Sequence, residues 1–194
     1  MSTKIASTTL PVTTNLKLVY LFSLLIAMLT GAVSIIGLLV PHGIYPTAEL
    51  QESFIANDAV NLFIGLPILL GSMWLAWRSK LIGLLFWPGA LLYGLYNYIV
   101  YLFGMPFNAM FPLYLTIVTL SIYTTIGLVA NIDGEVVKQR LNGRVPERLA
   151  AGVLIGLGIL FLLRSIGVIT SALVEQTPIA RTEQALLVAD SIIT

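Results

Sequence analysis

The chain has 194 residues, of which 58% are hydrophobic and 10% are charged, and its formal net charge is +1. An ordinary soluble domain carries about 25% charged residues, so a chain this apolar predicts a lipid bilayer as its main surroundings. The near-neutral net charge gives no argument for nucleic acid as a partner. The chain has no cysteine and one histidine, His42, which excludes disulfides, thiolate metal sites and bis-histidine haem within one chain. We therefore expect no metal and no cofactor.

Five segments are long and apolar enough to cross a bilayer, which needs roughly 20 residues per helix. The expected spans are residues 16–40, 59–77, 81–103, 110–130 and 149–173. The apolar run of the first span exceeds the roughly 7–15 residues typical of a signal peptide, which favours a retained helix. The sequence thus predicts an all-α protein, a polytopic transmembrane helix bundle that forms one domain over residues 1–194.

The basic residues of the connections predict the orientation of the chain. The connection 42–57 has no Lys or Arg, and the basic residues concentrate on the other side, at Lys4, Lys17, Arg78, Lys80, Lys138, Arg140, Arg144 and Arg148. The turn at residues 78–80 is flanked by tryptophans, as expected of an interfacial anchor: Trp74, Trp77 and Trp87. Because short basic loops stay in the cytoplasm, we predict a multi-pass protein of the cell membrane with a cytoplasmic N-terminus.

A short pattern recurs at an offset of 132 residues. Pro46-Thr47-Ala48 is followed by Asp58, and Pro178-Ile179-Ala180 is followed at the same distance by Asp190. The alternative explanation is that the two stretches resemble each other only because loops commonly contain such residues. If the repeat is real, residues 185–194 begin a sixth span that stops at about half the necessary length. The prediction is five complete spans plus a truncated sixth.

Arg164 lies inside the fifth expected span, where a guanidinium is costly unless it has a partner. With a rise of about 1.5 Å per residue, it would lie roughly 22 Å from the cytoplasmic start of a hydrocarbon core about 30 Å thick. We expect it to pair with Asp58, or with Asp190 if the sixth span is complete. Snorkelling of the long side chain to the interface is the alternative.

Other polar residues are expected at about the depth of Arg164, with Tyr93 somewhat deeper, where they could surround an outward-facing pocket: Asp58, Asn61, Tyr93, Asn97, Tyr101, Asn108 and Asp190. Tyr93, Asn97 and Tyr101 are spaced by four residues and therefore share one helix face. A structural role is the alternative for the whole set. Tyrosines form aromatic belts, asparagines join helices, and an aspartate can cap a helix.

Three runs resemble those of uncharacterised polytopic membrane proteins of prokaryotes. They are Asn57-Asp58 with Asn61-Leu62 and Pro67, then Tyr93 with Tyr96-Asn97-Tyr98, then Phe107-Asn108 with Phe111-Pro112-Leu113-Tyr114. The resemblance covers about residues 58–114. It implies a membrane protein with several spans and carries no functional residue over to this chain.

Three functions follow from these observations as hypotheses. The first is a binding or transport module with an outward-facing polar pocket around Arg164, suited to an anionic small molecule or a lipid headgroup. The second is a membrane enzyme that acts on a lipid-linked substrate, with Asp58 or Asp190 as acid or base. The third is a structural subunit whose polar groups join helices to one another or to partner helices. Whether the protein is an enzyme stays open at this point.

Overall fold

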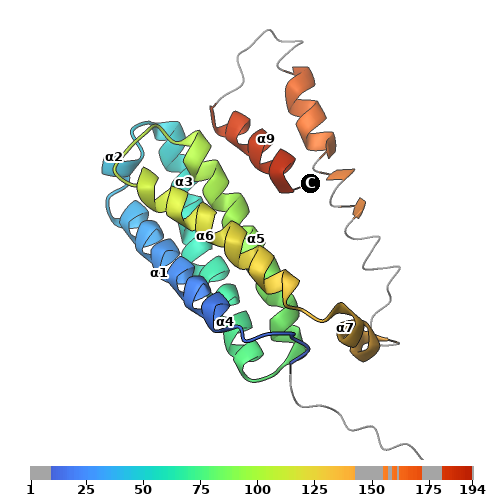
Figure 1. Cartoon of the computed structure of the whole chain (residues 1–194). Coiled ribbons are helices and arrows are strands. Elements are labelled where there is room, and N and C mark those ends of the chain that lie inside the picture. The colour runs from blue at the N-terminus through green and yellow to red at the C-terminus, as the bar shows by residue number, and fades with distance from the viewer. Residues whose placement is uncertain (1–9, 143–154, 157–158, 161, 172–180, 194) are drawn as a thin grey trace, which may run out of the picture.

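The structure is a computed structural model that describes residues 10–142, 155–156, 159–160, 162–171 and 181–193. Within these residues the fold is helical and contains no β-strand, which confirms the all-α prediction. Long helical segments run side by side as a bundle, and two shorter helices from the C-terminal part of the chain lie along one side of it (Figure 1).

Helix α1 (Lys17–Leu39) has two different faces. Its buried face carries small and hydroxylated residues, including Ser23, Ala27, Thr30, Gly31 and Ser34. Its outer face exposes large apolar side chains such as Leu18, Leu21 and Met28. Because small residues let helix backbones approach closely in lipid, α1 can pack directly against the second membrane segment and α6.

The second membrane segment begins earlier than the sequence predicts. After the short helix α2 (Pro41–Ile44), one continuous helix runs from Ala48 to Trp77 and consists of α3 (Ala48–Val60), the π-helix η1 (Asn61–Gly65) and α4 (Leu66–Trp77). The predicted start at residue 59 is therefore wrong. The Thr47 side chain caps the helix by accepting a hydrogen bond from Leu50 N at 3.3 Å. Leu50 and Phe54 are buried, so packing stabilises helical turns before Asp58.

Helix α5 (Leu81–Gly104) lies at the centre of the fold and contacts η1, α4, α6 and α9. Its bounds agree with the predicted span 81–103 to within one residue. Because neighbouring helices enclose it, α5 can bury polar side chains that lipid would not accept. These include Trp87, Asn97, Tyr98 and Tyr101. Trp87 is fully buried and donates to Ser23 Oγ at 3.0 Å, so its predicted role as an interfacial anchor is wrong.

Helix α6 (Phe111–Ala130) matches the predicted span 110–130 and packs on α1 and α5. The N-terminal segment is fastened to the end of this helix, where Thr13 N donates to Asn131 O at 2.9 Å. Helix α7 (Gly134–Leu141) follows in the predicted cytoplasmic connector. Asp133 caps it by accepting from Val136 N at 3.1 Å.

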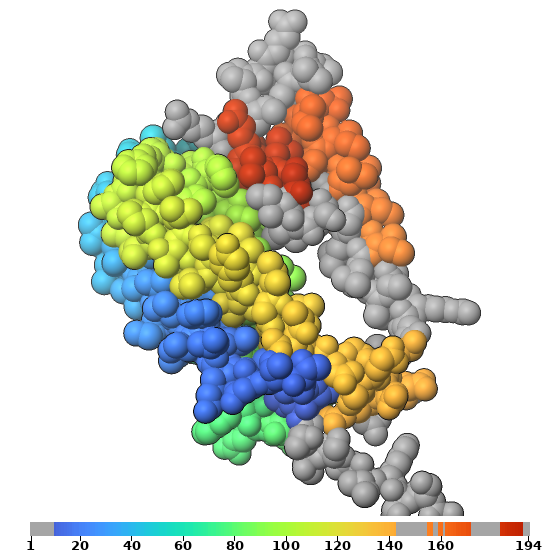
Figure 2. All heavy atoms as spheres, in the orientation of Figure 1, coloured from blue at the N-terminus to red at the C-terminus, as the bar shows by residue number. Residues whose placement is uncertain are grey.

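Two helices represent the C-terminal part of the chain. Leu162–Ser171 is a short apolar helix, and most of the rest of the predicted fifth span lies outside the described residues. Helix α9 (Arg181–Ile193) covers the predicted start of the sixth span, beginning four residues earlier, and packs along α5. In the space-filling view α9 lies between the main bundle and the helix Leu162–Ser171 (Figure 2).

Among the described residues, three helices are long and apolar enough to cross a membrane: Lys17–Leu39, Ala48–Trp77 and Phe111–Ala130. This supports a membrane protein with transmembrane helices. Helix α5, which has 24 residues and carries four tyrosines, Asn97 and Pro88, is not one of these three. The total of five spans and a sixth stays a prediction.

Candidate functional site

Asp58 is the most deeply buried carboxyl group that the structure describes, with an exposed fraction of 0%. The Tyr101 hydroxyl donates to its Oδ1 at 2.8 Å, and the Tyr45 hydroxyl donates to its Oδ2. Tyr45 belongs to the connection between α2 and α3, and burial followed by its bond to Asp58 raises the pKa of this hydroxyl, so it remains a donor at neutral pH. Gly37 of α1 lies against both groups, and a Cβ there would overlap the Asp58 carboxylate.

A second polar contact lies one helical turn further along the same membrane segment. Asn61 is 1% exposed and opens the π-helix η1, a form that is frequent at functional sites. Its Oδ1 accepts from the Tyr93 hydroxyl at 2.9 Å, while its Nδ2 is buried without a partner. A cavity of about 20 Å³ lies beside it, which is enough for one water molecule. The π-helix ends at Gly65, whose missing side chain makes room for the Tyr93 ring.

Arg164 lies in a third polar cluster, between two carboxylates of α9. Its guanidinium donates to Asp190 Oδ2 at 3.0 Å and to Glu183 Oε2 at 2.9 Å. Asp190 also accepts from the Tyr96 hydroxyl at 3.0 Å and from Ser165 Oγ at 3.3 Å. The Asp190 side chain is 4% exposed, whereas those of Arg164 and Glu183 are 31% and 41% exposed. This cluster joins the helix Leu162–Ser171 to α9 and to the tyrosine face of α5.

A cleft of about 440 Å³ lies between α3, α5 and α9. Its polar lining comes from Ser53 and Asn57 of α3, Tyr96 and Asn97 of α5, and Glu183 of α9. The remaining lining residues are apolar: Phe54, Ala56, Val60, Val100 and Leu186. Among the described residues that line the cleft, Glu183 is the charged one. A cleft with a few convergent polar groups on an apolar wall is the usual form of a small-molecule site.

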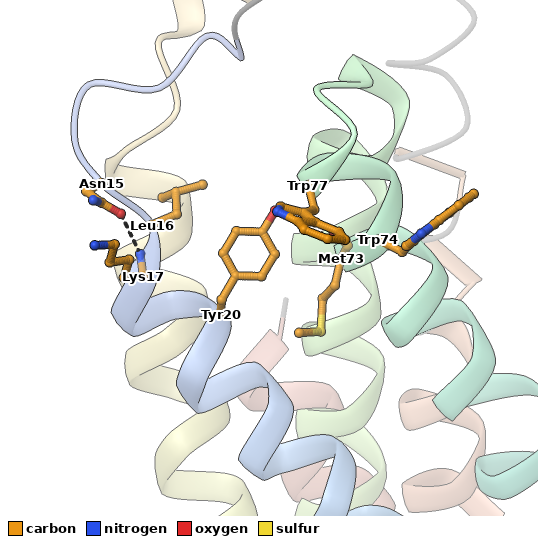
Figure 3. A pocket seen from close by; sticks show the side chains of 7 residues that line it. All are labelled: Asn15, Leu16, Lys17, Tyr20, Met73, Trp74 and Trp77. Carbon is orange, nitrogen blue, oxygen red and sulfur yellow. Dashed lines mark hydrogen bonds between the residues drawn. The ribbon is translucent and has the colours of Figure 1, made fainter.

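A larger groove of about 520 Å³ lies at the opposite end of the bundle, between α1 and α4 (Figure 3). The Tyr20 ring points from α1 toward Met73, and Trp74 and Trp77 extend from α4 beside it. Lys17 lies at its α1 edge, near Asn15. Trp74 and Trp77 are exposed, and the Arg78 guanidinium lies 4.8 Å from the Trp74 ring centre. These two tryptophans have the exposure expected of interfacial anchors.

The structure does not gather the eight predicted site residues in one pocket. It brings together Asp58 with Tyr101, Asn61 with Tyr93, and Arg164 with Asp190, in three separate contacts. Asn97 lines the cleft and donates to Tyr93 O at 3.1 Å. Asn108 instead shapes the connection before α6, because its Oδ1 accepts from Met110 N at 2.9 Å. Of the two expected partners for Arg164, the structure selects Asp190.

Sequence reasoning missed four residues of these clusters: Glu183, Tyr96, Tyr45 and Ser165. Glu183 precedes Asp190 by seven residues, a spacing that places two carboxylates on one helix face and could have identified it. Tyr96 follows Tyr93 by three residues, whereas the predicted helix face of Tyr93, Asn97 and Tyr101 was defined by a spacing of four residues. Tyr45 lies in a connection without a periodic pattern, so no local signal could place it against Asp58.

Comparison with known protein families, with curated proteins and with solved structures finds no match for this chain. In the part of the chain that the structure describes, no three His, Asp or Glu residues gather in a way that could hold a metal ion.

Proposed function

We propose that this protein is a membrane-embedded binding module and that its ligand occupies the cleft between α3, α5 and α9. The observation that carries the proposal is the lining, in which side chains of three helices present hydroxyl, amide and carboxylate groups to one space of about 440 Å³. Two of these helices, α3 and α5, belong to the bundle, and α9 supplies the third wall. Such a site is typical of the contacts between helices in membrane-protein bundles.

The charges at the cleft favour a ligand with a neutral or cationic polar group. The hypothesis of an anionic ligand depended on an available Arg164, but its guanidinium is held by Glu183 and Asp190. Among the described ion pairs, two carboxylates share this one guanidinium. Glu183 is also the only one of the three that lines the cleft. An ammonium or hydroxyl-bearing ligand, free or as a lipid headgroup, therefore matches the site better than an anion does.

A pair of simple probes tests this assignment. We expect choline chloride to raise the melting temperature of the full chain in detergent, and sodium acetate at equal ionic strength to leave it unchanged. Glu183→Gln should abolish the effect of choline on the melting temperature. Asn57→Ala, which removes a polar group of α3 from the cleft, should weaken that effect. Glu52→Gln is the matched control, because Glu52 is an exposed carboxylate of α3 that does not line the cleft.

Three results would overturn the proposal. They are stabilisation by acetate in place of choline, a choline effect that persists unchanged in Glu183→Gln, and no effect of either probe. The last result would favour the structural alternative, in which Arg164 and its two carboxylates only join helices.

The orientation of the chain is part of the same proposal. With a cytoplasmic N-terminus, the connection between α1 and α3 faces outward and the cleft opens toward that side. Because the chain has no cysteine, single cysteines report accessibility without background. We expect a membrane-impermeant maleimide added to intact cells to label Ser53→Cys, and to label Ser79→Cys only after permeabilisation. The reverse pattern would place the cleft on the cytoplasmic side.

A further inference from the structure

Asp58 is a buried titratable group that the proposed ligand cleft does not use. It is enclosed by side chains from four parts of the fold, and its exposed fraction is 0%. Both of its oxygens accept hydrogen bonds from tyrosine hydroxyls, Oδ1 from Tyr101 and Oδ2 from Tyr45. The Phe54 ring packs against Tyr45 and Tyr101 at centroid distances of 5.6 and 4.6 Å, which closes the site with an aromatic wall.

The groups that face Asp58 are tyrosines and small or hydroxylated residues. Tyr45 comes from the connection before α3, Tyr98 and Tyr101 from α5, and Tyr114 from α6. Helix α1 contributes Gly37, whose missing side chain lets α1 approach Asp58 and Tyr45 closely. Among the described residues, the ion pairs are those of Arg164 with Glu183 and Asp190, and none involves Asp58. No described cation therefore balances a charge on this carboxyl.

An ionised carboxylate buried without a cation costs far more than a neutral acid in the same place. The cost is highest in a membrane-spanning bundle, where buried acids commonly take part in proton relays. We propose that Asp58 is a proton-binding site, in which one proton is held at Oδ1 on the line to the Tyr101 hydroxyl. A tyrosine hydroxyl can accept one hydrogen bond while it donates another, so Tyr101 can receive the bond from a protonated Oδ1 while it donates to Phe54 O at 3.4 Å. Oδ2 then continues to accept from Tyr45.

Two further hydroxyls extend the polar surroundings of this site. Ser34 Oγ of α1 and the Tyr114 hydroxyl of α6 are both buried and lie close to Asp58. Hydroxyls beside a buried acid can hold a water molecule or pass a proton.

The proton site stands apart from the ligand cleft, although the two are neighbours. Asn57 and Phe54 line the cleft, and the Phe54 carbonyl accepts from the Tyr101 hydroxyl at 3.4 Å. Tyr101 therefore contacts both the proton site and the backbone of the cleft wall. Proton binding at Asp58 does not depend on any ligand in the cleft, so the two proposals can fail separately.

Infrared spectroscopy of the full chain in detergent tests the proposal, because a protonated carboxyl has a carbonyl stretching band that an ionised one lacks. With aspartate labelled with ¹³C at its carboxyl carbon, we expect an isotope-shifted band of a protonated aspartate at about pH 7, well above the ordinary aspartate pKa of about 3.9. The band should disappear in Asp58→Asn and persist in Asp133→Asn, the matched control at the cap of α7.

Tyr45→Phe keeps the test decisive if Asp58→Asn does not fold. This variant retains the carboxyl and removes one hydrogen-bond partner, so the same band should remain and move to higher wavenumber. The proposal is overturned if the wild-type chain shows no protonated aspartate band at neutral pH, or if the band is unchanged in Asp58→Asn. A band that vanishes when sodium chloride replaces an equal concentration of a bulky organic salt would identify a metal-cation site and also overturn it.

Discussion

Asp58 of α3 and Asp190 of α9 are both buried carboxyl groups. Each accepts a hydrogen bond from a tyrosine of α5, Asp58 from Tyr101 and Asp190 from Tyr96. The difference lies in what balances the charge. Asp190 pairs with Arg164 at the partly exposed edge of the fold, whereas Asp58 has tyrosine hydroxyls and complete burial. The same residue type is thus accommodated by a cation in one place and, as we propose, by a proton in the other.

The largest effect is expected from removing the cation of the Asp190 cluster. Arg164→Leu leaves Asp190 and Glu183 without their shared partner, which should cost about 2–4 kcal/mol of unfolding free energy, near the lower range for a broken buried pair because Arg164 is 31% exposed. Unfolding in mixed micelles by titration with sodium dodecyl sulfate measures the loss.

A double-mutant cycle separates the two aspartates. Arg164→Leu combined with Asp190→Asn should be less than additive by at least about 1 kcal/mol, because the two side chains are in direct contact. Arg164→Leu combined with Asp58→Asn should be additive, since Asp58 bonds to tyrosines of other elements. Coupling of Arg164 to Asp58 would contradict the division into two independent clusters.

The next effect concerns the space around Asp58. Gly37→Ala adds a Cβ that would overlap the Asp58 carboxylate and lie 2.5 Å from the Tyr45 hydroxyl. We expect a loss of about 1–3 kcal/mol, as for overpacking of a rigid core. Gly71→Ala in α4 is the control, because nothing lies within 4 Å of its added Cβ. That control should be neutral or stabilising by up to about 1 kcal/mol. Equal effects of the two substitutions in the same micelle titration would show that the Asp58 site is loosely packed.

Removing the two equivalent tyrosine hydroxyls compares the clusters directly. Tyr101→Phe removes one of the two tyrosine hydroxyls that are hydrogen-bonded to Asp58 and should cost about 1–2 kcal/mol of unfolding free energy. Tyr96→Phe should cost less than about 1 kcal/mol, because Asp190 keeps Arg164 and Ser165. The order of the two losses, measured under identical micelle conditions, is the result that matters. A larger loss for Tyr96→Phe would mean that the cation does not dominate at Asp190.

The positions of helices could be predicted from the sequence where the length of an apolar run determines them. The bounds of α5 and α6 agree with the predicted spans to within one residue. Polar residues mark the start of α5 and the end of α6, and the turn-forming residues Gly104, Pro106 and Asn108 separate the two helices. The start of the second segment at Ala48 could not be predicted in the same way. Residues 48–58 include Glu49, Glu52 and Asp58, which resemble a loop, but the Thr47 cap and the burial of Leu50 and Phe54 stabilise them as a helix.

The candidate site was harder to predict than the helices, because the depth of a residue in the membrane does not say in which direction its side chain faces. Residues that are predicted at one depth can still contact different groups, as Asp58 and Arg164 do, and the sequence does not say which helices are neighbours. The pairing of Arg164 with Asp190 could be expected from the cost of an unpaired charge. The contact between Tyr45 and Asp58 depends on the path of a connection that has no periodicity.

The smallest expected effect belongs to Glu183, the most exposed member of the ion-paired cluster. Its side chain is 41% exposed, so Glu183→Gln should lower the unfolding free energy by less than about 1 kcal/mol, as for ion pairs in contact with solvent. The dependence of the unfolding free energy on salt gives a sharper comparison of Glu183 with Asp58. Raising the ionic strength from about 0.1 M to 1 M shortens the screening length from about 10 Å to about 3 Å, which should weaken the wild-type chain slightly and leave Glu183→Gln nearly unaffected. Asp58→Asn should keep the wild-type salt dependence, because a neutral acid enclosed by tyrosines offers no charge for the salt to screen. If Asp58→Asn removed the salt dependence and Glu183→Gln did not, the assignment of the ionic site and the protonated site would have to be exchanged.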